Sequence, residues 1–171
     1  MSAWPGDEVV PDAPVVMDRE AVLPGTAEQL WPWLVQLGKD RAGWYFPRWA
    51  ERVVPPKGRG LRHLDPAFQH HEVGDRVPDY GPGDPEFELV TKQEPHVLVY
   101  RTERGSLVAS WALVAQDEPG GVRLHLRFRA RPGRRWTIPI VNTVGEFFDW
   151  ATVQLLFAGL RERLSQGPGR G

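Results

Sequence analysis

Residues 121–131 read GVRLHLRFRAR, in which apolar side chains alternate with basic or polar ones. Successive side chains of an extended strand point to opposite faces. This stretch therefore predicts a β-strand with one buried, apolar face and one solvent-exposed, polar face. The buried face would carry Val122, Leu124, Leu126, Phe128 and Ala130. The solvent-exposed face would carry Arg123, His125, Arg127, Arg129 and Arg131. One side of the strand is therefore expected to pack on the interior.

Short strands with turn residues between them precede this one. We predict strands at 73–78, 86–93, 97–103 and 106–116. Turn-forming residues follow these strands at 81–85 (GPGDP), 94–95 (EP), 104–105 (RG) and 118–121 (EPGG). Such spacing indicates an antiparallel meander. A first strand is expected at 17–23, where Pro24 and Gly25 end it.

The C-terminal part predicts one long helix over 141–164. Asn142, Glu146, Asp149 and Thr152 form a polar stripe at helical spacing, and most of the remaining surface is apolar. A helix with so broad an apolar surface is expected to pack on two sides.

Two shorter helices are expected after the first strand. Thr26 and Gln29 have the spacing of a capping box, which predicts a helix over 27–37 that ends at Gly38. Pro32 lies inside it, so the helix should kink there or begin anew. A second short helix is expected at 44–53, and residues 54–72 read as a long excursion without a clear period.

The order of these elements is that of the helix-grip fold. The chain resembles the START and Bet v 1-like (SRPBCC) superfamily, in the branch labelled polyketide cyclase/dehydrase and lipid transport. The resemblance spans about 17–164 and is carried by Pro24–Leu34 (PGTAEQLWPWL), Gly43–Tyr45, Val73–Pro78 (VGDRVP), Ser110-Trp111 and Arg123–Arg131. It implies an α+β fold in which a curved antiparallel β-sheet wraps around a long C-terminal α-helix, with two short helices after strand 1. We expect one domain over 15–164, with flexible tails at 1–14 and 165–171.

Composition excludes several classes of function. The chain has 171 residues, a net charge of -1 and no cysteine, so disulfides, thiolate nucleophiles and cysteine metal sites are absent. The near-neutral charge gives no overall attraction to nucleic acid. No apolar segment approaches the eighteen residues of a membrane span, and no secretion signal is visible, so a cytoplasmic protein is expected. We expect no cofactor and no metal, and the oligomeric state stays open.

Half of the eight tryptophans fall within residues 31–49, WPWLVQLGKDRAGWYFPRW. They could fill a core, line a cavity, or form a surface for a membrane or a nucleic acid. Trp31 and Trp33 are about 200° apart around a helix, so they cannot line the same face.

The resemblance implies a deep, mostly apolar cavity between the sheet and the C-terminal helix. Trp44 and Tyr45 would lie near its mouth, and Trp111 shares a strand face with Leu107, Ala109 and Leu113. The ligand-binding residues we expect are Trp44, Tyr45, Phe87, Leu89, Tyr100, Trp111, Leu113, Leu124, Phe128 and Phe148.

The polar candidates give no catalytic motif. His63, His70 and His71 lack metal-ligand spacing and are expected on a loop surface, and His125 is expected in solvent with the arginines of its strand. Tyr100 is the one candidate proton donor.

Three functions follow from these expectations. The first is binding of a hydrophobic or aromatic small molecule, such as a lipid or polyketide, in the cavity. The second is a polyketide cyclase- or dehydratase-like enzyme that uses the same cavity. The third is a protein-interaction module with a collapsed cavity, in which the basic sheet face meets an acidic partner.

Overall fold

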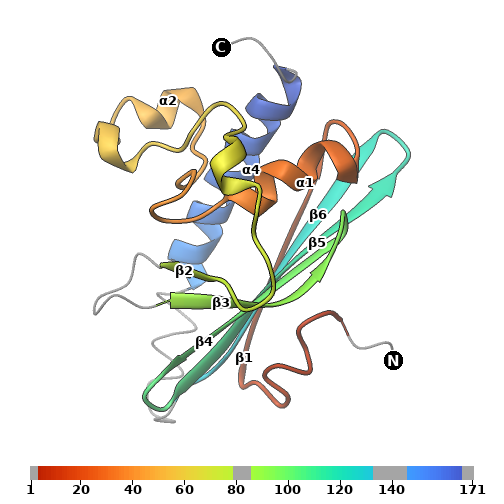
Figure 1. Ribbon diagram of the computed structural model, residues 1–171, viewed down its shortest axis with the longest axis vertical. Helices are drawn as coiled ribbons and strands as arrows, with labels where there is room; N and C mark the ends of the chain where they lie inside the picture. The colour runs from red at the N-terminus through yellow and green to blue at the C-terminus, as the bar shows by residue number, and fades with distance from the viewer. Residues whose placement is uncertain (1–3, 79–85, 133–145, 167–171) are drawn as a thin grey trace.

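A six-stranded antiparallel sheet forms the frame of the molecule, in the order β1-β6-β5-β4-β3-β2. The computed structural model describes residues 4–78, 86–132 and 146–166, with side chains of the last range from 150 onward. The strands are β1 (Val15–Leu23), β2 (Arg76–Pro78), β3 (Glu86–Gln93), β4 (Val97–Arg104), β5 (Leu107–Glu118) and β6 (Gly121–Arg131). The helices are α1 (Ala27–Gln36), α2 (Arg48–Glu51) and α4 (Glu146–Ser165). The curved sheet and its C-terminal helix confirm the expected helix-grip, α+β architecture (Figure 1).

The strand register places aromatic side chains in one row across the sheet. Tyr100 of β4 pairs with Trp111 of β5, and Trp111 pairs in turn with Phe128 of β6. Because directly paired residues project to the same side of a sheet, these three rings share the concave face. The apolar face predicted for β6 is confirmed, since Val122, Leu124, Leu126 and Ala130 are buried.

The helices lie on one side of the sheet (Figure 1). The predicted capping box opens α1: the backbone N–H of Gln29 donates to the Thr26 hydroxyl, and the Thr26 N–H donates to the Gln29 side chain. The helix continues through Pro32 to Gln36. Leu30 and Leu34 of α1 join Leu156 and Leu160 of α4 in the main core.

Residues 44–75 differ from the sequence prediction in extent. The second helix, predicted over 44–53, is only the single turn α2 from Arg48 to Glu51, because Pro47 starts it and has no side-chain cap. The strand predicted over 73–78 begins only at Arg76. The long excursion contains two 3-10 turns, Pro56–Gly58 and Pro66–Phe68. The predicted turn at 81–85 and the predicted first turn of the last helix, 141–145, lie outside the described residues.

The N-terminal segment was expected to be a flexible tail, but residues 4–14 lie on the outer face of the sheet, opposite the helices (Figure 1). Asp7 pairs with Arg127 at 3.0 Å and with Arg129 at 3.1 Å, and Trp4 stacks on His125 with ring centroids 4.3 Å apart. Beneath the segment, Val97, Val99, Ala112 and Val114 form a second apolar cluster against which Trp4 and Val9 pack. The outer face is therefore covered, and His125, expected in solvent, keeps only 12% of its side chain exposed.

Candidate functional site

A cavity of about 340 Å³ lies between the concave face of the sheet, the end of α1 and the start of the described part of α4. Such a volume is at the lower end of the range for sites that bind small organic molecules. The described residues that line it are Leu34, Leu37, Gly38, Lys39, Trp44, Val77, Pro78, Phe87, Tyr100, Trp111, Leu113, Phe128, Thr152 and Val153. Every strand except β1 contributes, so the sheet curvature shapes the site.

A row of aromatic rings forms one wall. Tyr100 and Trp111 have ring centroids 6.3 Å apart, and Trp111 stacks on Trp44 at 5.8 Å with planes 20° apart. The Trp44 Nε1 then donates to the Thr152 carbonyl of α4 at 3.3 Å. The wall thus runs without a break from β4 across to the helix.

The backbone around Trp44 separates its ring from that of Tyr45. Gly38 and Gly43 form a bridged turn, and Gly43 has a φ of 76°, which favours a residue without Cβ. Tyr45 is completely buried, donates its hydroxyl to the Trp33 carbonyl at 2.9 Å and meets the Trp33 ring edge-on. The chain passes so close to α4 that a Cβ at Gly159 would lie 2.3 Å from the Tyr45 carbonyl oxygen. Tyr45 therefore belongs to the core, while Trp44 reaches the cavity.

Polar groups gather behind the aromatic wall. His71 is buried and stacks on Tyr100 with ring centroids 5.8 Å apart. Neither ring nitrogen of His71 has a hydrogen-bond partner among the described residues, and the Asp75 carboxylate lies 3.5 Å away. Arg41 donates to the carbonyls of Val35 and Phe68. Burial, together with the positive charge of Arg41, lowers the pKa of His71 and so favours the neutral imidazole.

Tyr100 is likewise protonated at neutral pH. Its side chain is 5% exposed, and burial raises the pKa of its phenol far above the ordinary value. The phenol therefore remains a hydrogen-bond donor at neutral pH and cannot serve as a base. Lys39 and Thr152 are the other polar side chains among the described residues of the lining.

The structure brings six of the ten expected ligand-binding residues to the cavity: Trp44, Phe87, Tyr100, Trp111, Leu113 and Phe128. Tyr45, Leu89 and Leu124 do not line it, and each is fully buried in the main core. Leu124 lies near the start of β6, close to the β5–β6 turn. The side chain of Phe148 lies outside the described residues.

The sequence interpretation missed the contribution of α1 and the turn after it. Leu34 lies in the last turn of α1, whereas Leu37 and Gly38 follow the end of the helix, where helical periodicity gives no signal. Val77 and Pro78 were also missed. The expectation of a surface loop holds for His63 and His70, which are exposed, and is wrong for His71.

The four clustered tryptophans have three different environments. Trp31 and Trp33 are each 6% exposed and pack in the core, whereas Trp44 lines the cavity. Trp49 is 65% exposed. Packing and cavity lining therefore account for three of the four.

Within the described ranges, no three His, Asp or Glu side chains are arranged to hold a metal ion. No helix in those ranges combines the length and apolar character needed to cross a bilayer.

Comparisons with known proteins establish the fold. No family model and no curated protein sequence match the chain. Among solved structures, a Rhodobacter sphaeroides protein aligns over 91% of this chain and 95% of its own, with a TM-score of 0.59 and 14% identity. Bacillus halodurans protein BH1534 aligns over 89% and 98%, with a TM-score of 0.57 and 12% identity.

A third similar structure is DynU16, a protein in the dynemicin biosynthetic locus. It aligns over 90% of this chain but only 48% of its own, with a TM-score of 0.54 and 11% identity. This chain thus spans about half the length of DynU16. At such low identities the likenesses show a shared fold and leave the activity undetermined.

Proposed function

We propose that the protein binds an apolar or aromatic small molecule in the cavity. The observation that carries the proposal is the aromatic wall of Tyr100, Trp111 and Trp44, which faces open volume instead of packed side chains. Flat rings offer a ligand a large contact area, and aromatic pairs favour offset stacking. Removing about 200 Å² of apolar ligand surface from water would contribute about 5 kcal/mol.

The polar groups of the lining would orient the ligand. The Tyr100 hydroxyl and the Lys39 ammonium can both donate, so a carbonyl, phenol or carboxylate on the ligand would find a partner. The position of DynU16 in a biosynthetic locus is compatible with a secondary metabolite as the ligand. We place the chain, on the same proposal, in the polyketide cyclase/dehydrase and lipid transport branch.

Native mass spectrometry of the freshly purified protein, followed by organic extraction, tests the proposal. A co-purified apolar molecule at near-stoichiometric amount, or saturable binding of an apolar fluorescent probe that quenches tryptophan emission, is the expected result. Absence of both would refute ligand binding.

An enzyme that uses the same cavity is the second candidate. The observation in its favour is Tyr100, a buried phenol held protonated between the His71 ring and the Trp111 ring. Such a group can donate a hydrogen bond to a carbonyl oxygen that gains charge during an aldol-type ring closure, whereas its raised pKa makes full transfer of the proton less favourable.

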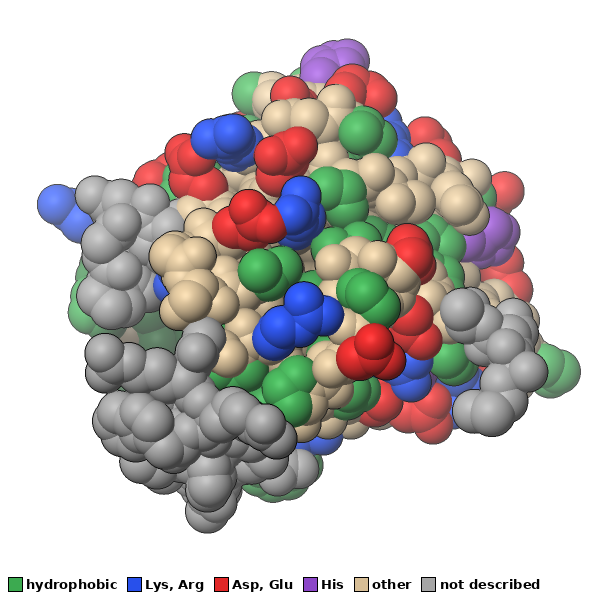
Figure 2. All heavy atoms as spheres, turned by 90° about the horizontal axis from the view of Figure 1, so that it is seen from below, with side chains coloured by type: hydrophobic (Ala, Val, Ile, Leu, Met, Phe, Trp, Pro, Cys, Tyr) green, Lys and Arg blue, Asp and Glu red, His purple; other side chains and the backbone are tan. Residues whose placement is uncertain are grey.

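The third expectation, an interaction module that uses a basic sheet face, loses its main support. Arg123 pairs with Glu20 and Glu118, while Arg127 pairs with Asp18 and Asp7. The charge of these arginines is therefore largely compensated within the chain. On the face shown in Figure 2, basic and acidic side chains are interspersed, so that face also has no patch of a single sign.

A further inference from the structure

The turn α2 and the residues after it expose apolar side chains that the fold does not use. Trp49 is 65% exposed and Val53 is 84% exposed, the two highest values among the large hydrophobic side chains described. They are four positions apart, so they lie on one side of a helical turn. Pro55 and Pro56 are exposed just beyond. We call Trp49, Val53, Pro55 and Pro56 the α2 patch.

Exposed cations surround the α2 patch. Arg48, Arg52, Lys57 and Arg59 are all exposed, and none forms an ion pair with another described residue. The one acidic residue between positions 48 and 60 is Glu51, whose side chain is only 12% exposed. The rim of the patch is therefore positive, although the whole chain has a net charge of -1.

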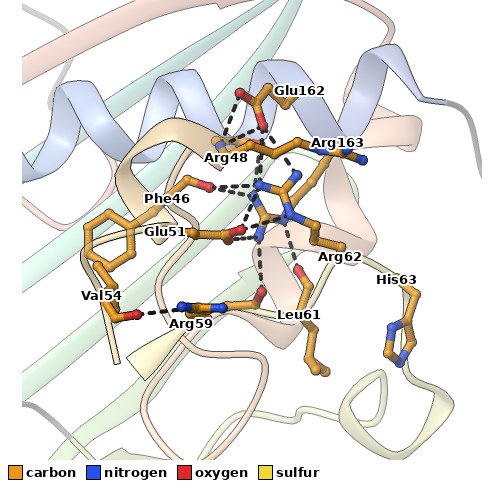
Figure 3. Close-up of polar contacts among 12 residues, drawn as sticks. Phe46, Arg48, Glu51, Val54, Arg59, Leu61, Arg62, His63, Glu162 and Arg163 are labelled. Atoms are coloured by element: carbon orange, nitrogen blue, oxygen red, sulfur yellow. Dashed lines mark hydrogen bonds and ion pairs between the residues drawn. The ribbon is translucent and has the colours of Figure 1, made fainter. Parts of the chain in front are cut away.

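The nearby carboxylates are paired with arginine side chains (Figure 3). Glu51 accepts from Arg62 at 2.8 Å and lies 3.4 Å from the Arg163 guanidinium. Glu162 accepts from Arg62 and from the backbone N–H of Arg48. Both carboxylates are therefore paired with arginines, which compensates their negative charge beside α2.

The segment that carries the patch is anchored at both ends. Arg163 of α4 is 2% exposed and donates to the carbonyls of Phe46, Gly60 and Leu61, which bracket the segment (Figure 3). Arg59 donates to the Val54 carbonyl and closes the turn. The patch is thus a preformed surface at one end of the molecule, beside the C-terminal part of α4 (Figure 1).

We propose that the α2 patch docks the protein on the surface of an anionic lipid bilayer. Tryptophan is favoured at the boundary between headgroups and acyl chains, where its ring is buried and its N–H stays hydrated. Val53 would enter beside Trp49, and the four cations would meet anionic headgroups. The attraction acts within a Debye length of about 8 Å at physiological salt, so the local charge matters and the net charge does not.

An acidic protein is the other class of partner for a cationic surface. It would use the cations, but it would leave two highly exposed apolar side chains at the centre without a counterpart. A bilayer accommodates both features at once. Docking on a bilayer requires no molecule in the cavity, so this proposal stands apart from the proposed function.

Cosedimentation of the full chain with vesicles tests the proposal, using pure phosphatidylcholine and a mixture with about 30% phosphatidylserine. We expect binding to the mixed vesicles, a blue shift of tryptophan emission on binding, and a loss of binding as salt is raised. Trp49→Ser should remove most of the blue shift and weaken binding at least tenfold. Arg52→Gln with Lys57→Gln should weaken it by about 25-fold, at roughly fivefold per cation.

Trp150→Ser is the matched control, because Trp150 is 51% exposed on α4 and lies outside the patch. It should leave binding unchanged, and all the variants should melt near the parent because the altered side chains are exposed. No binding to mixed vesicles at low salt, equal weakening by Trp150→Ser, or binding that Trp49→Ser leaves unchanged would each overturn the proposal. The last result would instead indicate a purely electrostatic surface.

Discussion

Trp44 stacks on Trp111 with ring centroids 5.8 Å apart, although one ring comes from the loop after α1 and the other from the centre of the sheet. Their contact joins two parts of the chain at the cavity wall. A ligand against this wall would touch both rings, so intrinsic fluorescence reports directly on the site.

Two leucines on the concave face distinguish cavity from core. Leu113 lines the cavity and Leu124 does not, although both are buried. Leu113→Trp should place its indole in the open volume, keep stability within about 1 kcal/mol of the parent and weaken binding of an apolar probe at least tenfold. Denaturant unfolding and probe titration measure the two effects.

Leu124→Trp is the counterpart, because it adds the same volume where no cavity exists. Overpacking should cost about 1–3 kcal/mol or more. Equal destabilisation by the two substitutions would show that the cavity is not available to a side chain, and would count against ligand binding.

Tyr100→Phe separates the enzyme from the carrier. Loss of the hydroxyl should abolish turnover of any substrate found, by at least about 100-fold in kcat, while probe affinity changes only a few-fold. A carrier should instead show a modest affinity change and no turnover in either form. Full turnover by the variant would exclude Tyr100 as the proton donor.

The sheet could be predicted from sequence because its concave face has a strict period of two. The bounds of β3 and β6 match the prediction, and those of β4 and β5 differ by one or two residues. Ala112 and Val114 are apolar and lie on the face of β5 opposite Trp111. Apolar residues on both faces of β5 indicate that both faces of this strand are buried. The N-terminal segment provides that second layer.

The cavity wall was predictable only in part. Periodicity shows which face of a strand a residue lies on, but not whether that residue lines the cavity or packs in the core. Leu113 and Leu124 share the concave face, yet only Leu113 lines the cavity, and the alternation of residues does not distinguish the two. The burial of His71 has no sequence signal, because it depends on the loop between Phe68 and Arg76 folding back over Tyr100.

The N-terminal segment should stabilise the fold. Deleting residues 1–12 would expose Val97, Val99, Ala112 and Val114 and remove the Asp7 partner of Arg127 and Arg129. We expect the melting temperature to fall by several degrees, measured by calorimetry. Deleting 167–171 is the comparison and should have little effect. An unchanged melting temperature after the first deletion would show that the segment is a flexible tail.

Arg163 should be the most costly charged residue to replace near α2. Arg163→Met would leave the carbonyls of Gly60 and Leu61 without their donor and take a counterion from Glu51. Loss of one member of a buried charged network typically costs about 3–5 kcal/mol. Arg161→Met, at an exposed neighbour, should stay within about 0.5 kcal/mol of the parent in urea unfolding.

His71 should make stability depend on pH in the mildly acidic range. Burial and the nearby cations Arg41 and Lys92 lower the pKa of His71 in the folded protein below 6.5, although Asp75 opposes them. The unfolded chain then binds a proton that the folded protein does not, so stability is lost as pH falls below about 6.5. One such group changes the free energy of unfolding by at most about 1.4 kcal/mol per pH unit.

His71→Phe tests this dependence, because phenylalanine keeps a flat ring against Tyr100 and cannot titrate. Urea unfolding between pH 7.5 and about 5 should show a steeper loss of stability for the parent than for the variant. Asp18 does not interfere: burial would raise the pKa of its carboxyl, but hydrogen bonds from Arg127 and His125 lower it below 3.8, outside this window. Parallel curves for parent and variant would mean that His71 reaches water in the folded protein, and that the polar space behind Tyr100 is open to solvent instead of sealed.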